Sequence, residues 1–458
     1  MVSAETLTDD IVRELVHLIG IARPSAEPNG RIVRHIQSIL EPLGYTTRQF
    51  MSTGIAGNHI NLYCAKSRKP TLLFCAHTDT VPPGDQSRWT ETLQDPWNAK
   101  VKEGRVYGLG ASDTLGSIAL LLSLARHNLL FEESALLFTA QEEIGALGAY
   151  DVLRLEGVPG SVELVVVCEP TNNLVVLGEK GYVPFDIVIR GIIDRNAKGR
   201  VEEDDVKVLL VVGQEAHSAR PAQGKNAIFE TASMEDVEEI ADRHVVLSME
   251  CRGVRNKVPG LCAVRYCEKK SLKSYGKHTE WQLKKLLPFL RRLQELQSEL
   301  AETRDDRFQP PEVTLNAGSL TAMMDEVVIA CDLRPLPGQD GSAIVSRILE
   351  TARAMLGESS VSLRIPHGPI PPVWSEVPKF IEEELRDRID PYGKSAYTEA
   401  AMFVQAGFRA VICGPGNLLV HRANEYIDIS ALEEGSRLYQ RLSRLSHKMR
   451  QRKWTLET

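Results

Sequence analysis

The sequence predicts an α/β protein with a mixed, largely parallel sheet flanked by helices, into which a smaller α+β domain is inserted. Over the first 180 residues, short and fully apolar segments alternate with amphipathic helical segments, a pattern typical of parallel strands covered on both faces. Strand-like segments then dominate until residues 366–372, where four prolines in seven residues indicate a linker. We therefore expect a discontinuous first domain of residues 1–182 and 368–458, and an inserted domain of residues 183–367.

The elements of the first domain follow from the spacing of apolar residues, because helices repeat every 3.6 residues and buried strands form short continuous apolar runs. Helices are expected near residues 8–20, 29–42, 114–128 and 146–155, and strands at residues 61–64, 71–75, 135–139 and 163–168. After the prolines, a strand is expected at residues 410–413 and a helix at residues 429–446.

The inserted domain has a different pattern, in which most elements read as strands. Strands are expected at residues 182–190, 206–212, 245–251, 261–266, 312–315, 326–333 and 360–365. Helices are expected at residues 225–244, 280–304 and 342–356. The highly charged segment 194–205 is expected to be a loop.

The composition excludes some classes of protein. A net charge of −7 does not support binding to nucleic acid. The eight cysteines are scattered through apolar segments without any C-x-x-C pair, which predicts reduced, buried thiols in a cytoplasmic protein and not metal ligands. No signal peptide and no membrane-spanning segment is expected, because the apolar segments are too short or carry charges.

Acidic and imidazole side chains gather where the predicted strands of the first domain end. They are His77 and Asp79, Glu142 and Glu143, Glu169, and His421, with Asp113 at a glycine-rich turn into a helix. Each has an ordinary alternative explanation, since adjacent glutamates are usually solvated and an aspartate at such a turn is often a helix cap. Their common position is more specific, because the carboxyl ends of parallel strands line one crevice. Imidazoles and carboxylates without thiolates suit Zn²⁺, Co²⁺ or Mn²⁺, and two ions if one carboxylate bridges them.

The ordered set of motifs resembles that of the M20 family of dizinc aminoacylases and carboxypeptidases, over nearly the whole chain. The resemblance implies two Zn²⁺ ions, with Co²⁺ or Mn²⁺ as alternatives, held by His77 and Glu169 on one side, by Glu143 and His421 on the other, and by Asp113 between them. It also implies that Glu142 is the general base and that Asp79 accepts the second ring N–H of His77.

The resemblance further implies that the inserted domain is a lid and dimerisation domain. Its motif around His217 is similar to one whose histidine reaches a neighbouring subunit's active site and stabilises the oxyanion. Arg334 is expected to bind the substrate carboxylate, although an ordinary pair with Asp332 is an equal alternative. Asn256 lies in an Asn-x-Val-Pro motif that here stands far upstream of Arg334, so its role in substrate binding is open.

The expected substrate depends on one further motif. The run of Tyr397, Thr398, Glu399 and Ala400 is similar to the Thr-Glu-Ala run of the deacetylases in this family, which implies substrate-binding roles for Thr398 and Glu399. We therefore expect removal of an acetyl group from an N-acyl amino acid, with N-acetylornithine in arginine biosynthesis as the first candidate. A dipeptidase, carboxypeptidase or desuccinylase with the same metal site is the alternative.

Overall fold

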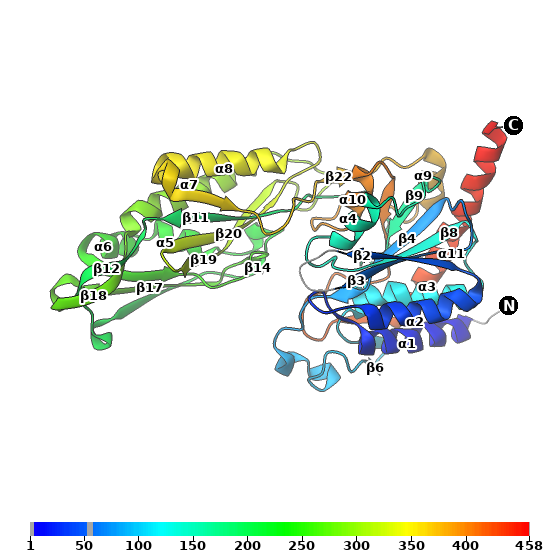
Figure 1. The fold of residues 1–458 in the computed structure, drawn as a ribbon, viewed down its shortest axis with the longest axis horizontal. Helices are drawn as coiled ribbons and strands as arrows, with labels where there is room; N and C mark the ends of the chain where they lie inside the picture. The colour runs from blue at the N-terminus through cyan, green and yellow to red at the C-terminus, as the bar shows by residue number, and fades with distance from the viewer. Residues whose placement is uncertain (1–3, 53–57, 458) are drawn as a thin grey trace. The chain divides into compact units, whose positions relative to one another are not determined.

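The computed structural model describes residues 4–52 and 58–457. It divides into two compact units (Figure 1). The first unit comprises Met1–Gly178, Val373–Gly393 and Tyr397–Thr458, and the second comprises Glu179–Pro372 and Lys394–Ala396. The second unit is thus inserted in the sequence of the first, with a three-residue segment from the later part of the chain joining it.

The first unit is built on a six-stranded sheet. In the order of the sheet, its strands are β2 (Thr46–Ser52), β3 (His59–Ala65), β8 (Ser134–Thr139), β4 (Leu72–His77), β9 (Leu164–Val167) and β23 (Ala410–Ile412). The last four run parallel to one another, while β3 is antiparallel to both of its neighbours. The predicted mixed, largely parallel α/β class is therefore confirmed.

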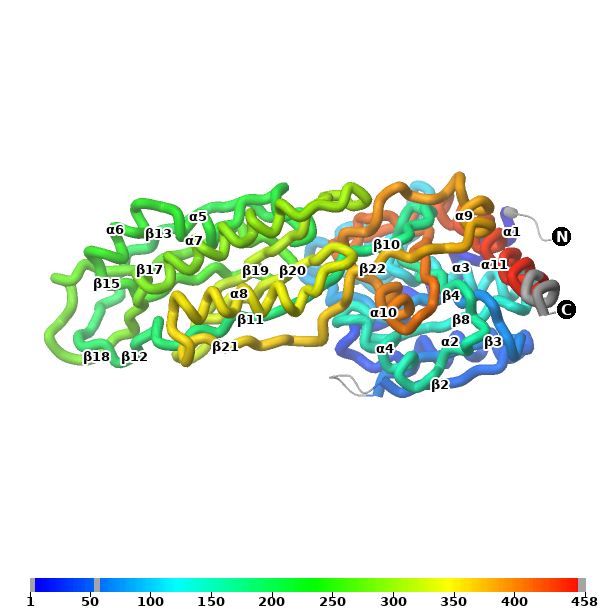
Figure 2. The backbone as a smooth tube through the Cα atoms, turned by 90° about the horizontal axis from the view of Figure 1, so that it is seen from above, coloured from blue at the N-terminus to red at the C-terminus, as the bar shows by residue number. Residues whose placement is uncertain are grey.

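Helices cover both faces of this sheet, which is why the central strands are apolar along their whole length (Figure 2). One face packs against α1 (Ala4–Ile21), α2 (Gly30–Leu40), α3 (Gly116–Arg126) and α11 (Ile429–Glu457), and the other lies beside α4 (Leu147–Arg154) and α10 (Ala400–Gln405). Leu72, Phe74 and Ala76 of β4 belong to the core on the α3 side. Because side chains alternate along a strand, Cys75 and His77 face the α10 side.

The second unit is α+β. Its main strands are β11 (Val183–Arg190), β13 (Lys207–Val212), β15 (His244–Glu250), β17 (Leu261–Glu268), β19 (Thr314–Met323), β20 (Glu326–Arg334) and β21 (Val361–Arg364). They form the sheets β19-β20-β11-β21 and β13-β17-β15. Its helices are α5 (Ala227–Ser233), α6 (Glu235–Arg243), α7 (Leu283–Leu300) and α8 (Gly341–Leu356). Throughout the part of the chain that the structure describes, no helix is both long and apolar enough to cross a membrane.

The loop expected at residues 194–205 is wrong for most of its length. Residues 193–200 form β12 (Ile193–Arg200), which pairs with β18 (Lys273–Trp281) in a two-stranded antiparallel ribbon. The charged side chains of β12 are exposed, while Ile193 and Ala197 are buried. The charged residues of this segment are typical of a loop, so the sequence did not indicate a strand. The strand forms because β18, about eighty residues further along the chain, supplies its hydrogen bonds.

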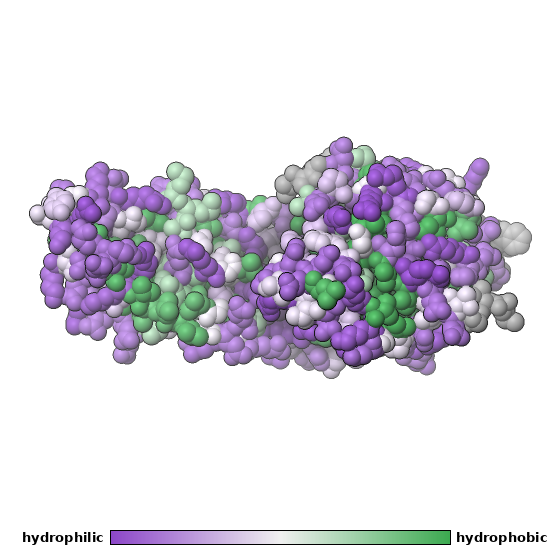
Figure 3. All heavy atoms as spheres, turned by 90° about the horizontal axis from the view of Figure 1, so that it is seen from below, coloured by the Kyte–Doolittle hydropathy of each residue, from purple (hydrophilic) through white to green (hydrophobic). Residues whose placement is uncertain are grey.

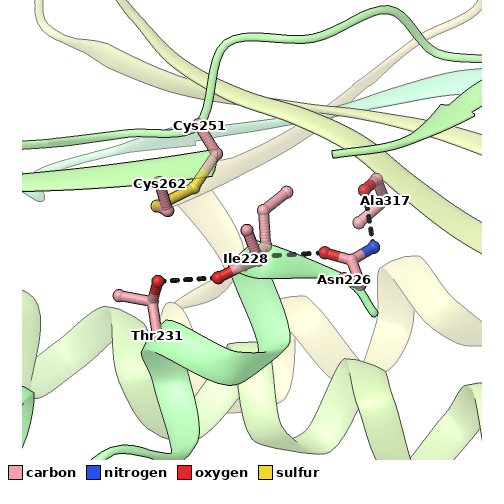
Figure 4. Close-up of a disulfide and its surroundings, with 7 residues drawn as sticks. Asn226, Ile228, Thr231, Cys251, Cys262 and Ala317 are labelled. Carbon is pink, nitrogen blue, oxygen red and sulfur yellow. Dashed lines mark hydrogen bonds between the residues drawn. A yellow bond between two sulfur atoms is a disulfide. The ribbon is translucent and has the colours of Figure 1, made fainter. Parts of the chain in front are cut away.

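The prediction of eight reduced thiols is wrong for Cys251 and Cys262, which form a disulfide. Glu250 of β15 lies opposite Ala263 of β17, so Cys251 and Cys262 are the next opposed pair, with Cα atoms 4.2 Å apart. Figure 4 shows this disulfide beside the first turn of α5. The other six cysteines are free and buried. The register of the two strands brings the pair together, and their spacing in the sequence does not reveal it.

Replacing both Cys251 and Cys262 by alanine is expected to lower the free energy of unfolding by about 3 kcal/mol. The two cysteines are 11 residues apart in the sequence, and a disulfide that closes such a loop restricts the unfolded chain. Urea denaturation of the wild type and the double variant measures the difference. Alkylation of the denatured protein without reductant provides the control, since six thiols should react. Reaction of all eight would contradict the disulfide.

Candidate metal centre

The carboxyl ends of four neighbouring strands deliver the polar side chains of the candidate site. His77 is the last residue of β4, and Glu142 and Glu143 follow β8. Glu169 follows β9, and the loop after β23 carries His421. Asp113 comes from the turn Ala111–Leu115, which leads into α3. All six side chains belong to the first unit and converge at one edge of its sheet.

Asp113 lies between the two histidines and directs one carboxylate oxygen to each. His77 Nε2 is 3.1 Å from Asp113 Oδ1, and His421 Nε2 is 3.1 Å from Asp113 Oδ2. On the first side, His77 Nε2 is also 3.5 Å from Glu169 Oε1. On the second, His421 Nε2 is 3.1 Å from Glu143 Oε1. The arrangement therefore has two halves that share one carboxylate.

Burial and charge perturb the titration of these groups. Burial alone lowers the pKa of the His77 imidazole, but the hydrogen bond to Asp113 and the surrounding carboxylates raise this pKa well above its usual value. Burial acts to raise the pKa of Asp113, yet hydrogen bonds from both histidines hold it far below its usual value. Burial and then the charge of Glu169 raise the pKa of Glu142 well above its usual value. So much carboxylate charge in a buried site favours a bound cation.

The residues present fit a pair of divalent ions. Three sets of residues could each hold an ion, because within each set the ligand atoms lie within 4.8 Å of one another. The sets are His77, Asp113 and Glu169; His77, Glu142 and Glu143; and Asp113, Glu143 and His421. The donors are imidazole nitrogens and carboxylate oxygens without a thiolate, a set that suits Zn²⁺, Co²⁺ or Mn²⁺. The division of the two Asp113 oxygens between two histidines is what a bridging ligand requires.

Asp79 supports the site in a different way from the one predicted. The ring Nδ1 of His77 is 2.9 Å from the backbone oxygen of Asp79 but 3.7 Å from its carboxylate. The carboxylate instead accepts hydrogen bonds from the backbone N–H groups of Glu142 and Glu143, at 3.3 and 3.4 Å, and from Ser25 Oγ at 2.6 Å. Asp79 therefore fixes both the imidazole and the turn that carries the paired glutamates.

Sequence reasoning missed Glu425, a buried carboxylate next to the centre. Its Oε1 accepts hydrogen bonds from the backbone N–H groups of Ser112, at 2.9 Å, and Asp113, at 3.3 Å. Burial raises the pKa of Glu425 to about 8. Its position four residues after His421 was the only available signal in the sequence, and that spacing is common without any such role.

Replacing Glu425 by alanine is expected to weaken metal binding by about 10- to 100-fold, because residues that orient metal ligands typically contribute that much. The substitution leaves the backbone N–H groups of Ser112 and Asp113 without their acceptor. Competition with a chromogenic chelator measures the affinity, and Glu433→Ala, a change of a partly buried glutamate on α11, is the control. Unchanged affinity in Glu425→Ala would contradict this role.

Thr398 and Glu399, which were predicted to bind substrate, are fully buried in the first unit at the start of α10. Thr398 Oγ1 accepts a hydrogen bond from the backbone N–H of Ala400 at 3.0 Å. The carboxyl of Glu399 contacts the side chains of Cys75 and Thr139, on β4 and β8. Contact of either residue with substrate stays a prediction.

In the second unit, the structure brings His217 and Asn256 together. His217 belongs to β14 (Ala216–His217), which pairs with β16 (Lys257–Val258). The backbone N–H of Ser218 donates to the backbone oxygen of Asn256 at 3.0 Å. Ser218 also accepts a hydrogen bond from Arg334, so the Asn256 motif and Arg334 approach the same segment despite their separation in the sequence.

Arg334 lies beside these residues and is almost fully buried. It pairs with Asp332 at 3.1 Å, and its Nη2 donates to Ser218 Oγ at 3.4 Å. Its guanidinium also lies over the ring of Tyr182, 4.9 Å from the centroid, and Nη1 donates to the backbone oxygen of Ser395 at 3.4 Å. The pair with Asp332 thus forms as the alternative explanation anticipated, and binding of a substrate carboxylate stays a prediction.

Imidazole and carboxylate ligands gathered at the carboxyl ends of parallel strands are typical of metal-dependent hydrolases with an α/β fold. The chain belongs to peptidase family M20/M25/M40, which it matches over residues 73–444. It is therefore an M20 metallohydrolase, as the order of its motifs predicted.

Three similar proteins illustrate the relationship. The acetylornithine deacetylase of Myxococcus xanthus is 27% identical over 439 residues, which cover 91% of this chain and 92% of the relative. The succinyl-diaminopimelate desuccinylase of Legionella pneumophila (strain Lens) is 29% identical over 241 residues, covering 49% and 61%. The structure of aminoacylhistidine dipeptidase from Vibrio alginolyticus superimposes with a TM-score of 0.63 at 15% identity, covering 97% and 98%, a likeness of fold alone.

Proposed function

We propose that this protein removes an acetyl group from an N-acyl amino acid, with N-acetylornithine as the first candidate substrate. The observation that carries the proposal is the candidate metal centre, in which Asp113 divides its oxygens between two histidines and Glu142 lies beside them. Similarity to acetylornithine deacetylases over nine-tenths of the chain supports the choice of substrate. The resemblance of the run at residues 397–400 to the deacetylase motif is in accord with this choice.

The mechanism assigns different tasks to the paired glutamates. His77 and Glu169 would hold one divalent ion, Glu143 and His421 the other, and Asp113 would bridge them. When bound, the ions supply Lewis-acid activation of water and of the amide carbonyl. The Glu142 carboxylate accepts a proton from the attacking water and then donates it to the departing amine nitrogen.

The second unit is proposed as the lid, and as the site of contact in a homodimer. Three side chains on one face of the edge strand β13, Val208, Leu210 and Val212, are more than half exposed. Leu261, the residue of β17 that pairs with Val212, is about half exposed. Figure 3 shows hydrophobic side chains at the surface of this unit. A second copy of the chain would cover them, and His217 would then serve the neighbouring subunit by stabilising the oxyanion.

A panel of substrates tests the proposal. The purified protein, supplied with Zn²⁺ or Co²⁺, is assayed with Nα-acetylornithine, other Nα-acetyl amino acids, N-succinyl-diaminopimelate and dipeptides. We expect the highest kcat/KM for Nα-acetylornithine and loss of activity after chelation, with recovery when metal is restored. A higher kcat/KM for the succinyl compound or for a dipeptide would overturn the proposed substrate and favour the desuccinylase or dipeptidase alternative.

A further inference from the structure

The carboxyl group of Glu399 is fully buried against side chains of two adjacent strands of the sheet, although it takes no part in the proposed mechanism. Its Oε2 accepts hydrogen bonds from Thr139 Oγ1 at 2.9 Å and from Cys75 Sγ at 3.3 Å. Its Oε1 has no hydrogen-bond partner among the residues that the structure describes. Burial raises the pKa of Glu399 to about 7. A carboxyl group held in this way costs stability, so its two contacts need an explanation beyond packing.

Both hydrogen-bond partners of Glu399 lie near the ends of strands that carry or precede candidate metal ligands. Thr139, the last residue of β8, is the direct neighbour of His77 in the register of the sheet. Cys75 lies two residues before His77 on β4, so the Cys75 and His77 side chains face the same side. The backbone oxygen of Thr139 also accepts hydrogen bonds from Thr78, from its N–H and its hydroxyl, both at 2.8 Å.

The chain beyond Thr139 leads within four residues to Glu142 and Glu143. The position of Thr139 therefore affects where the paired glutamates lie relative to His77, and Glu399 holds Thr139 from the α10 side. The carboxyl spans β4 and β8 through side chains alone, in addition to the backbone ladder that already joins these strands.

We propose that Glu399 is a positioning residue, which holds the ends of β4 and β8 together and thereby sets the separation of His77 from the Glu142–Glu143 pair. This inference rests on the proposed function in one respect, namely that these residues bind metal. It differs from the substrate-binding role that the sequence motif implies, because the Glu399 carboxyl accepts its hydrogen bonds from strand side chains and the residue has no exposed surface.

The test compares Glu399→Ala with the conservative variant Glu399→Gln. The amide oxygen of glutamine can accept the same two hydrogen bonds, whereas alanine removes them. We expect the apparent affinity for Zn²⁺, measured by competition with a chromogenic chelator, to fall about 10- to 100-fold in Glu399→Ala. It should stay within about threefold of the wild-type value in Glu399→Gln. With metal at saturation, KM should be unchanged in both variants.

The matched control is Glu133→Ala. Glu133 is also a buried carboxylate, but it precedes the opposite end of β8 and accepts a hydrogen bond from Arg450 at 2.8 Å. Its loss should lower the urea midpoint without changing the affinity for Zn²⁺. Thr139→Val, which removes one of the two donors to Glu399, should lower that affinity about tenfold and serves in place of Glu399→Ala if the latter does not fold.

The outcomes separate the two proposals. Unchanged affinity for Zn²⁺ in folded Glu399→Ala and Thr139→Val would overturn the positioning role and leave the proposed function intact. A raised KM with unchanged affinity in Glu399→Ala would overturn it in favour of direct contact with substrate. A wild-type protein that does not bind Zn²⁺, Co²⁺ or Mn²⁺ would overturn the proposed function, and this inference with it.

Discussion

Glu142→Gln is expected to retain bound metal but to lower kcat by about 10²- to 10⁴-fold, the usual contribution of a general base. The substitution keeps the shape of the side chain while removing its ability to accept a proton. Glu142 is buried beside His77 and Glu143, so bulk water cannot readily take its place. Steady-state kinetics on Nα-acetylornithine, with metal content measured by atomic emission, provides the comparison.

The matched control for this variant is Glu132→Gln, which neutralises an exposed glutamate just before β8. It should behave as the wild type in both measurements. If Glu142→Gln turned over substrate at the wild-type rate, Glu142 would not be the general base. If it lost metal instead, Glu142 would be assigned as a ligand.

Asp113→Ala is expected to have the second large effect, because a single side chain serves both halves of the centre. Its two oxygens contact His77 and His421 separately, so the substitution removes one ligand from each proposed ion. We expect metal content to fall toward zero under dialysis. We expect kcat/KM to fall by at least roughly a thousandfold, since bound ions stabilise the transition state by several kcal/mol.

Asp85→Ala is the control for this loss, because Asp85 is an exposed aspartate of the first unit that caps a short turn. Circular dichroism and the urea midpoint establish that both variants fold. Retention of two ions per chain in folded Asp113→Ala would contradict the bridging role. Retention of one would show that the two halves bind metal independently.

The sequence predicted the first unit well because its information is local. The strands β4, β8 and β9 are short and continuously apolar, since helices cover both of their faces, and such runs are recognisable without tertiary contacts. His77, Glu142 and Glu169 could be predicted as one cluster for the same reason, because each follows such a strand and parallel strands end at one edge.

Features that depend on the register of paired strands or on contacts between distant segments were not predicted. The strand β12 and the disulfide of Cys251 with Cys262 both depend on a register that only the folded sheet defines. Glu425 and Ser25 are ordinary polar residues in the sequence, and their contacts with Asp113 and Asp79 come from elements far away along the chain. Neither periodicity nor composition carries information of this kind.

The sequence by itself thus determined the fold class, the family and the set of residues that meet at the carboxyl edge of the sheet, because apolar periodicity and motif order are properties of the chain. The tertiary structure decided how those residues divide their contacts: the two oxygens of Asp113 between two histidines, and the carboxylate of Asp79 on the backbone of the paired glutamates. It also placed the carboxyl of Glu399 against side chains of β4 and β8, where a motif had suggested contact with substrate. The physical reason is that hydrogen bonds act over about 3 Å, and only the packed fold sets distances on that scale.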